Sequence, residues 1–178
     1  MSTPRKVALV TGSATGVGRA SAIRFAKLGY AVAVNFSRSV DDAAETLRLV
    51  QTEGVPAFAH KADVGTDSEV RELLARVRTE LGGLDVLVNN AATTQFIPHA
   101  DLDALDDEIW DEIFRVNVKG VLYCTRAALK MLQERRGCVV NVTSVAGLSG
   151  SGSSVPYCAT KGAVNTMTKS FAKAFGPA

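Results

Sequence analysis

The amino-acid sequence predicts an α/β protein built on a doubly wound parallel sheet. Short apolar runs alternate with longer amphipathic segments along the chain, in the order strand then helix. The run from Leu84 to Val88 is nearly continuous in its apolar residues, which is typical of a strand in the middle of a parallel sheet. A glycine-rich turn also separates the first apolar run from the first amphipathic segment. This alternation predicts right-handed crossovers, with helices on both faces of the sheet.

The expected elements follow one another without a repeat or an interdomain linker, so residues 1–178 are predicted to form a single domain. Strands are expected at residues 7–10, 31–36, 55–62, 84–88 and 138–142. Helices are expected at residues 19–28, 40–53, 67–81, 109–132 and 156–175. Asp67 is the expected N-cap of the third helix, because its carboxylate can accept a bond from the free N–H groups of the first turn.

The turn after the first strand is a candidate phosphate-binding loop. Its glycines have the spacing G-x-x-x-G-x-G. Glycines let the backbone turn tightly and let an anion approach the free N–H groups at the start of the next helix. The alternative is a tight connection that binds nothing. The loop residues expected to contact a dinucleotide are Gly12, Ser13, Thr15, Gly16, Val17 and Gly18.

The end of the second strand bears on the choice between two nicotinamide cofactors. An acidic residue at this point bonds the ribose hydroxyls of NAD, whereas a basic one accommodates the 2′-phosphate of NADP. Ser37 and Arg38 follow the strand, and no carboxylate precedes Asp41. A hydroxyl and a guanidinium suit a phosphate, so NADP(H) is favoured over NAD(H). The alternative is that Arg38 is a solvated loop residue.

Two further strand ends carry candidate cofactor contacts. Asp63 and Val64 follow the third strand, at the edge of the sheet where ligands bind in open α/β folds. Asp63 is expected either to accept a bond from an adenine amine or only to cap its own loop. After the fourth strand come Asn90 and Ala91. Small residues here would let the backbone pass beneath a cofactor, while asparagine ties neighbouring strand ends together.

The stretch from Asn141 to Lys161 carries residues suited to proton transfer. Tyr157 and Lys161 are one helical turn apart, so both side chains share a face. An ammonium beside a phenol favours the phenolate and would lower the tyrosine pKa toward neutrality. Ser144 can hydrogen-bond the oxygen of a substrate held against the tyrosine. The alternative is an ordinary Tyr–Lys pair on a helix.

Asn117 lies in the middle of the expected helix 109–132, where asparagine is a poor helix former. Its side chain is expected to bond the helix backbone, to bend the helix, or to bind a water molecule.

The composition excludes several classes of partner. The net charge of +2 is too small to indicate nucleic acid or an acidic membrane. Cys124, Cys138 and Cys158 have no metal-like spacing and are expected to be free thiols, as in a reducing compartment. The two histidines lie outside any metal-ligand pattern, so no metal is expected. Because the sequence lacks a long apolar run and a signal peptide, a cytoplasmic location is predicted.

Taken together, these motifs resemble the short-chain dehydrogenase/reductase family. The resemblance rests on the glycine-rich turn, Asp63-Val64, Asn89-Asn90-Ala91, Asn117, Ser144 and Tyr157-x-x-x-Lys161, in order over almost the whole chain. It implies a Rossmann-type fold, a nicotinamide cofactor and hydride transfer between carbonyls and secondary alcohols. The closest similarity is to NADP-dependent ketoreductases.

The resemblance also implies a role for each residue of the motifs. Tyr157 would be the general acid/base, and Lys161 would lower its pKa and hold the nicotinamide ribose. Ser144 would position the carbonyl, and Asn117 would hold a water in a proton relay to Lys161. The glycines would carry the pyrophosphate, Asp63 and Val64 the adenine. Tyr157, Lys161, Asn90 and Ala91 would lie along the cofactor.

Members of that family normally continue into a sixth strand, a substrate loop and a seventh strand, so the fold is expected to be truncated after the helix carrying Tyr157 and Lys161. The function predicted is carbonyl reduction or alcohol oxidation of a small molecule by a homodimer or homotetramer. The alternatives are a catalytically silent dinucleotide-binding or assembly protein, or an inactive fragment of a longer reductase.

Overall fold

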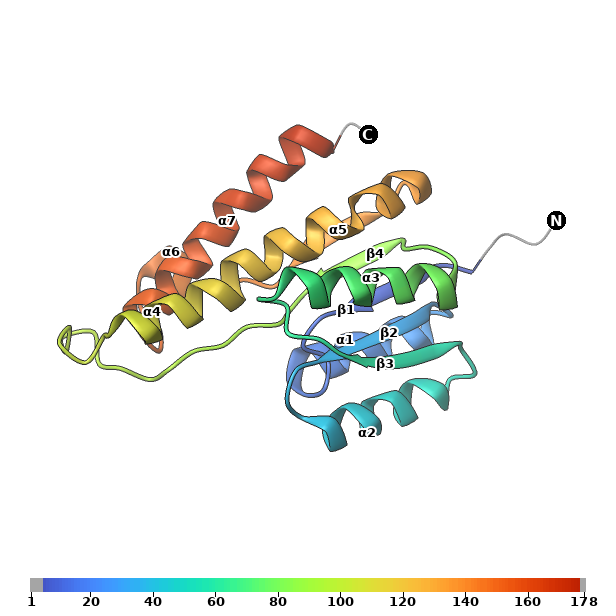
Figure 1. The fold of residues 1–178 in the computed structure, drawn as a ribbon, viewed down its shortest axis with the longest axis horizontal. Helices are drawn as coiled ribbons and strands as arrows, with labels where there is room; N and C mark the ends of the chain where they lie inside the picture. The colour runs from blue at the N-terminus through green and yellow to red at the C-terminus, as the bar shows by residue number, and fades with distance from the viewer. Residues whose placement is uncertain (1–4, 177–178) are drawn as a thin grey trace.

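In the computed structural model, which describes residues 5–176, the chain forms a parallel sheet with the strand order β3-β2-β1-β4-β5 (Figure 1). The strands are β1 (Val7–Val10), β2 (Ala31–Phe36), β3 (Ala57–Lys61), β4 (Val86–Asn89) and β5 (Cys138–Asn141). Every neighbouring pair is parallel. The predicted doubly wound Rossmann-type sheet is confirmed.

Most of the helices lie in the connections between strands, and the last two follow β5. They are α1 (Gly16–Lys27), α2 (Val40–Gln51), α3 (Asp67–Leu81), α4 (Asp107–Phe114), the π-helix η1 (Arg115–Lys119), α5 (Gly120–Arg135), α6 (Ala146–Ser149) and α7 (Val155–Phe175).

Two apolar clusters hold the layers together, one on each face of the sheet. On one face, residues of α3 and α5 such as Leu73 and Ala128 pack on Leu9 and Leu87. On the other, Ala22 of α1 and Val50 of α2 belong to the cluster built on strand residues that include Val10 and Val34. Alternate residues of β1 therefore point to opposite clusters, and all four are fully buried. This burial fixes the strands, and with them the loops at their carboxyl ends.

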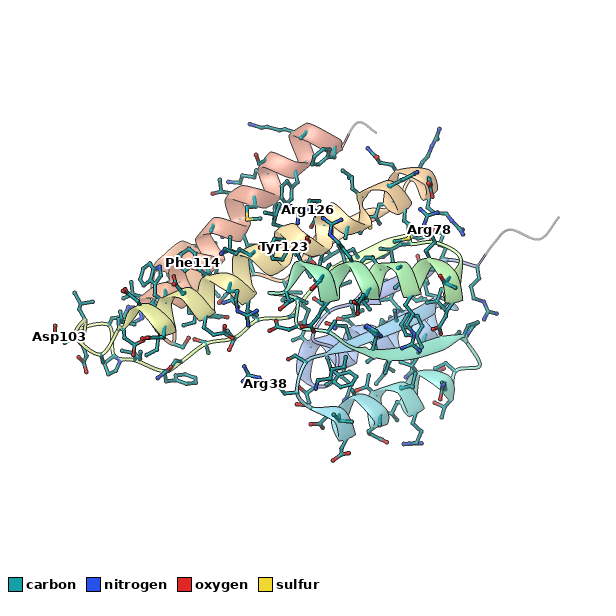
Figure 2. The ribbon with its side chains drawn as sticks, in the orientation of Figure 1. Arg38, Arg78, Asp103, Phe114, Tyr123 and Arg126 are labelled. Atoms are coloured by element: carbon teal, nitrogen blue, oxygen red, sulfur yellow. The ribbon has the colours of Figure 1, made fainter. Side chains whose placement is uncertain are left out.

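The predicted N-cap at Asp67 is wrong by one residue. The cap position is Thr66, and Asp67 is the first residue of α3. Its carboxylate accepts bonds from Arg71 at 2.8 Å and from Arg126 of α5 at 2.7 Å; Arg126 is labelled in Figure 2. A carboxylate in the first turn still complements the helix dipole, so the charge has a role at this end that does not require capping geometry.

The predicted long helix 109–132 is not uniform. It runs as α4, η1 and α5, and the backbone N–H of Gly120 donates to the carbonyl of Arg115 across the wider π turn. Asn117 lies inside this π turn. Its side-chain amide bonds Thr93 and Thr160 and makes no bond to the backbone of its own helix. The short helix α6 was not predicted, because four residues give no readable periodicity.

Candidate active site

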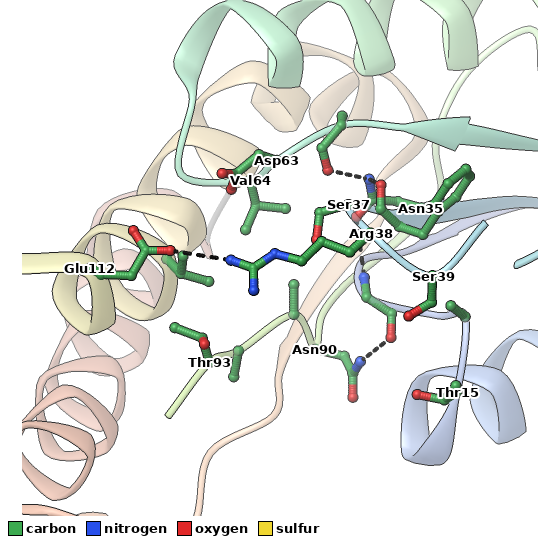
Figure 3. A pocket seen from close by; sticks show the side chains of 17 residues that line it. Thr15, Asn35, Ser37, Arg38, Ser39, Asp63, Val64, Asn90, Thr93 and Glu112 are labelled. Carbon is green, nitrogen blue, oxygen red and sulfur yellow. Dashed lines mark hydrogen bonds and ion pairs between the residues drawn. The ribbon is translucent and has the colours of Figure 1, made fainter. Parts of the chain in front are cut away.

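A cavity of about 380 Å³ lies where the first four strands of the sheet end. The neighbours β1 and β4 are not consecutive in sequence, which makes their boundary the point where the strand order reverses. Ligands bind at this point in doubly wound sheets. The predicted cofactor residues that line the cavity are Gly12, Thr15, Ser37, Arg38, Asp63, Val64, Asn90 and Ala91 (Figure 3).

The glycine-rich turn brings the backbone close to the loop after β4. Gly12 has φ +59°, and a Cβ added there would lie 2.7 Å from the Cα of Ala91. A Cβ on Gly18 would lie 2.5 Å from the carbonyl oxygen of Gly12. The Asn90 amide donates to that same oxygen at 3.0 Å and to the Thr11 carbonyl at 2.9 Å. The two loops therefore form one rigid wall of the cavity.

The start of α1 is left open for an anion. Thr15 holds the N-cap position without a side-chain cap, and the first turn contains no acidic residue. Gly16 has φ +56°, and an added Cβ there would meet nothing within 4 Å. Uncapped N–H groups beside open space, with no negative charge, are what a pyrophosphate needs at a helix N-terminus.

The remaining loop residues have different positions. The Ser13 hydroxyl is buried and donates to the Val10 carbonyl at 2.7 Å, so it stabilises the turn from within. Gly18 is buried beneath the turn, and the Val17 side chain is exposed at the first turn of α1. The cavity lining does not include Ser13, Gly16, Val17 or Gly18.

Asn35 is a functional residue whose role sequence reasoning missed. It is buried at the end of β2, where its amide oxygen accepts the Gly12 N–H at 3.1 Å and its amide nitrogen donates to the Ala62 carbonyl at 2.9 Å. It thus ties the glycine-rich turn to the loop after β3. The readable signal was a polar residue inside the apolar run Ala31–Phe36, which in a buried strand needs partners.

Arg38 reaches across the mouth of the cavity. It leaves the loop after β2, and its guanidinium Nη2 lies 3.8 Å from Oε1 of Glu112 on α4 (Figure 3). The side chain is 84% exposed, so its cation remains accessible to a ligand. Ser37 lines the same mouth.

Asp63 forms an ion pair that the sequence did not reveal. Its Oδ2 accepts from Arg115 Nη2 at 2.8 Å, and its Oδ1 accepts the Gly65 N–H at 2.9 Å. Partial burial opposes ionisation, but these two bonds outweigh it and hold the pKa of Asp63 below its usual range. The hydrogen bonds from Arg115 to Glu112 and then to Asp63 raise the pKa of the guanidinium. Asp63 therefore caps its own loop, which was one of the two alternatives expected for it. Its bond from Arg115 also anchors η1.

The predicted catalytic residues gather around the start of α7. Lys161 is 4% exposed, and its ammonium lies 5.5 Å from the centre of the Tyr157 ring. It donates to the Val142 carbonyl at 3.0 Å, which fixes the cation beside the loop after β5. Burial lowers the pKa of Lys161. The Tyr157 side chain is half-buried, so its ring is reachable from the surface.

Asn117 connects the predicted catalytic residues to the cavity. It is 2% exposed, and its amide bonds both the N–H and the carbonyl of Thr93, at 2.8 and 2.9 Å. Thr93 lines the cavity. The Asn117 amide also donates to the Thr160 hydroxyl at 3.2 Å, and that hydroxyl donates to the Tyr157 carbonyl at 2.7 Å. The π turn therefore aims Asn117 at both α7 and the loop after β4.

Ser144 lies in the loop between β5 and α6. Its hydroxyl accepts the Ala146 N–H at 3.2 Å, which holds the loop in a local turn. The helix α6 then packs backbone to backbone on α7, because a Cβ on Gly147 would lie 2.5 Å from the carbonyl carbon of Lys161. This contact holds the Ser144 loop against the helix that carries Tyr157 and Lys161.

Two absences are specific to the described part of the chain. Between residues 5 and 176, His, Cys, Asp and Glu side chains do not gather in a group of three that could hold a metal ion. Over the same range, none of the helices has both the length and the apolar character needed to cross a membrane.

The sequence matches the short chain dehydrogenase family over residues 6–178. It is 43% identical over 173 residues to a Streptomyces violaceoruber protein assigned as ketoacyl reductase 2 of the granaticin polyketide synthase, covering 97% of this chain and 68% of that one. It is 38% identical over 169 residues to the 3-oxoacyl-acyl-carrier-protein reductase FabG of Staphylococcus epidermidis, covering 94% and 68%.

Solved structures agree with the sequence matches. A short-chain dehydrogenase/reductase from Burkholderia xenovorans has a TM-score of 0.95 at 39% identity, covering 99% of this chain and 74% of that one. An alcohol dehydrogenase from Thermococcus sibiricus, complexed with 5-hydroxy-NADP, has a TM-score of 0.89 at 31% identity, covering 97% and 72%. The NADH-dependent reductase A1-R′ has a TM-score of 0.90 at 27% identity, covering 97% and 72%. The fold is thus shared with an enzyme complexed with an NADP derivative and with a reductase described as NADH-dependent. The chain belongs to the short-chain dehydrogenase family of oxidoreductases.

Proposed function

We propose that this protein is an NADP(H)-dependent oxidoreductase that interconverts a carbonyl and a secondary alcohol, with Tyr157 as its general acid/base. The observation that carries the proposal is the position of Lys161, which is buried, bonded to the Val142 carbonyl and 5.5 Å from the Tyr157 ring centre. A buried cation held beside the tyrosine suits a site where a proton passes to or from the tyrosine oxygen.

The residues present fit a dinucleotide. The uncapped start of α1 and the open space at Gly16 suit its pyrophosphate. The cavity continues past Asp63 and Val64, which suit the adenine, to Asn90 and Ala91, which suit the part leading to the nicotinamide. When bound, the nicotinamide supplies or accepts the hydride.

The proton chemistry belongs to the chain's own residues. In reduction, the Tyr157 hydroxyl gives its proton to the carbonyl oxygen; in oxidation it takes the proton back. Ser144 donates a hydrogen bond to the same oxygen and stabilises the developing alkoxide. Lys161 would hold the ribose, while Asn117 would support a water in the proton path to Lys161.

The choice of NADP(H) rests on Ser37 and Arg38. Arg38 is a largely exposed cation at the cavity mouth, directly after β2. A 2′-phosphate at this position would gain a charge-assisted hydrogen bond that a ribose hydroxyl cannot match. The names of the related proteins favour a 3-oxoacyl group or another ketone as the substrate.

A homodimer or homotetramer is part of the proposal. The helices α4 and α5 expose Trp110 at 37% and Leu122 at 38%, and the Trp110 ring stacks on Phe114 at 5.3 Å. Apolar groups on the outer side of these helices would be buried in a subunit interface.

The test is Tyr157→Phe, assayed by NADPH oxidation with a panel of ketones. The variant keeps the ring but loses the transferable proton, so reduction should fall by a factor of at least about 100. NADPH affinity, measured by fluorescence, should stay near that of the wild type. Turnover at the wild-type rate by the variant would overturn the role of Tyr157. Cofactor binding by the wild type without any turnover would favour a catalytically silent dinucleotide-binding protein instead.

A further inference from the structure

Four charged side chains of alternating sign form a row along one side of the cavity. Asp63 pairs with Arg115 at 2.8 Å, Arg115 pairs with Glu112 at 2.7 Å, and Glu112 lies 3.8 Å from Arg38. The row begins at the loop after β3, crosses η1 and α4, and ends on the loop after β2. Its last member, Arg38, is the cation assigned above to the 2′-phosphate.

Glu112 is fixed within this row, whereas Arg38 is not. The Arg115 guanidinium donates two hydrogen bonds to Glu112, from Nε to Oε2 at 2.7 Å and from Nη2 to Oε1 at 3.0 Å. These side chains are 31% and 38% exposed, while Arg38 is 84% exposed. Figure 3 shows Arg38 extended across the cavity toward Glu112. The carboxylate therefore holds a set position, and the exposed guanidinium points toward it.

We propose that Glu112, held in place by Arg115, competes with the cofactor's 2′-phosphate for Arg38 and so is a specificity-determining residue of the cavity. This inference rests on the proposed use of NADP(H). In the structure Arg38 faces Glu112. A 2′-phosphate draws Arg38 away from Glu112, whereas a cofactor that ends in ribose hydroxyls leaves the pair undisturbed.

The distances indicate whether Arg38 binds the Glu112 carboxylate or a 2′-phosphate more strongly. Charge-assisted hydrogen bonds measure about 2.7–2.9 Å. The Arg38–Glu112 separation of 3.8 Å is longer, so this pair is held by charge alone. A phosphate carries more negative charge and three acceptor oxygens, so it takes the guanidinium from the carboxylate. Glu112 lowers the affinity for the phosphate without preventing its binding.

The test uses two probes that carry only the adenosine end of the cofactors, 2′,5′-ADP and 5′-AMP, titrated calorimetrically into the full chain. Removing one member of an exposed ion pair changes binding by a factor of about 1.5 to 5. Glu112→Gln should tighten 2′,5′-ADP by such a factor and leave 5′-AMP unchanged. The control is Glu134→Gln, which removes the carboxylate of the Arg78–Glu134 surface pair at 3.0 Å and should change neither probe.

A second arm asks whether Glu112 acts through Arg38. In an Arg38→Gln background, Glu112→Gln should no longer tighten 2′,5′-ADP; a tightening that persists in full would overturn the competition. If Glu112→Gln leaves the ratio of the 2′,5′-ADP and 5′-AMP affinities unchanged, the competition is overturned as well. If the wild type binds neither probe, the proposed cofactor fails together with this inference. If the wild type binds both probes and Glu112→Gln does not change the ratio of their affinities, the proposed cofactor stands and the proposed role of Glu112 is wrong.

Discussion

At the scale of single residues, Asn117 is buried with its side-chain amide fully engaged. Its buried amide satisfies both backbone groups of Thr93 and also contacts Thr160. A leucine at this position would leave the Thr93 N–H and carbonyl without these partners inside the protein. A fully buried backbone group that loses its partner costs about 1–3 kcal/mol, and Thr93 is half-buried, so each of its groups is expected near the lower end.

Asn117→Leu should therefore lower the free energy of unfolding by about 2–4 kcal/mol, measured by urea denaturation. Thr160→Val removes the contact at 3.2 Å and the bond from the same hydroxyl to the Tyr157 carbonyl, which stays within its own helix, and should cost about 1 kcal/mol. Equal losses in the two variants would contradict the view that the Thr93 bonds dominate.

The Asp63 carboxylate makes the folding stability of the protein depend on pH in a defined way. Its pKa in the folded protein lies below the ordinary value of 3.8, so folding favours the ionised form. The stabilisation is fully present above pH 3.8 and is lost only as the pH falls through the lower, folded-state pKa.

The wild type should accordingly be more stable than Asp63→Asn by about 1 kcal/mol or less, because the pair is partly exposed. That difference should be constant from about pH 7 to 5 and shrink only under more acidic conditions. Urea denaturation across this range measures it, with Asp111→Asn, an exposed carboxylate on α4, as the baseline. A difference that already vanishes between pH 7 and 5 would contradict the assignment.

At the scale of elements, the start of α1 combines a left-handed glycine with open space. Gly54, after α2, is its matched control, since it has φ +71° and nothing within 4 Å of an added Cβ. Gly16→Ala and Gly54→Ala should both lose about 1–2 kcal/mol of stability through backbone strain.

Only Gly16→Ala should lose cofactor affinity, by a factor of about 10 or more, because its methyl group points into the space assigned to the pyrophosphate. Thermal melting and NADPH titration of both variants test this pair of expectations. Equal cofactor affinity in the two variants would place the pyrophosphate elsewhere.

Elements with strong periodicity were the ones that sequence reasoning could predict. The strands and long helices follow from runs of buried residues such as Val7–Val10 and from stripes such as that of α3. The π turn at Arg115–Lys119 could not be predicted as such, because it widens a single turn without changing the apolar pattern around it. Asn117 signalled a disturbance there but not its form.

The same distinction applies to the site. Residues at strand ends could be predicted to meet, because parallel strands bring their carboxyl ends to one edge. The positions of Arg115 and Glu112 at the site could not be predicted, since charged residues on an amphipathic helix usually face solvent. Arg115 meets Asp63 across 52 residues of sequence, a pairing that only the packing of η1 on the loop after β3 produces.

At the scale of the whole molecule, the loop after β4 joins the cavity to the start of α7. Asn90 bonds the glycine-rich turn, and Thr93, three residues on, bonds Asn117 beside α7. The cavity proposed for the cofactor and the residues proposed for catalysis are thus held in register by one short segment. The chain spans 68% of the length of the granaticin and FabG relatives described above. A cytoplasmic location and a single domain stay predictions.

The central claim is that the cavity at the switch point of the sheet binds NADP(H). It is tested most directly by calorimetric titration of the purified chain with NADPH and, separately, with NADH. The expected result is binding of both at one site per chain, with NADPH tighter by a factor of about 10, as one charge-assisted contact from Arg38 provides. Tighter binding of NADH, or no binding of either nucleotide, would contradict the account.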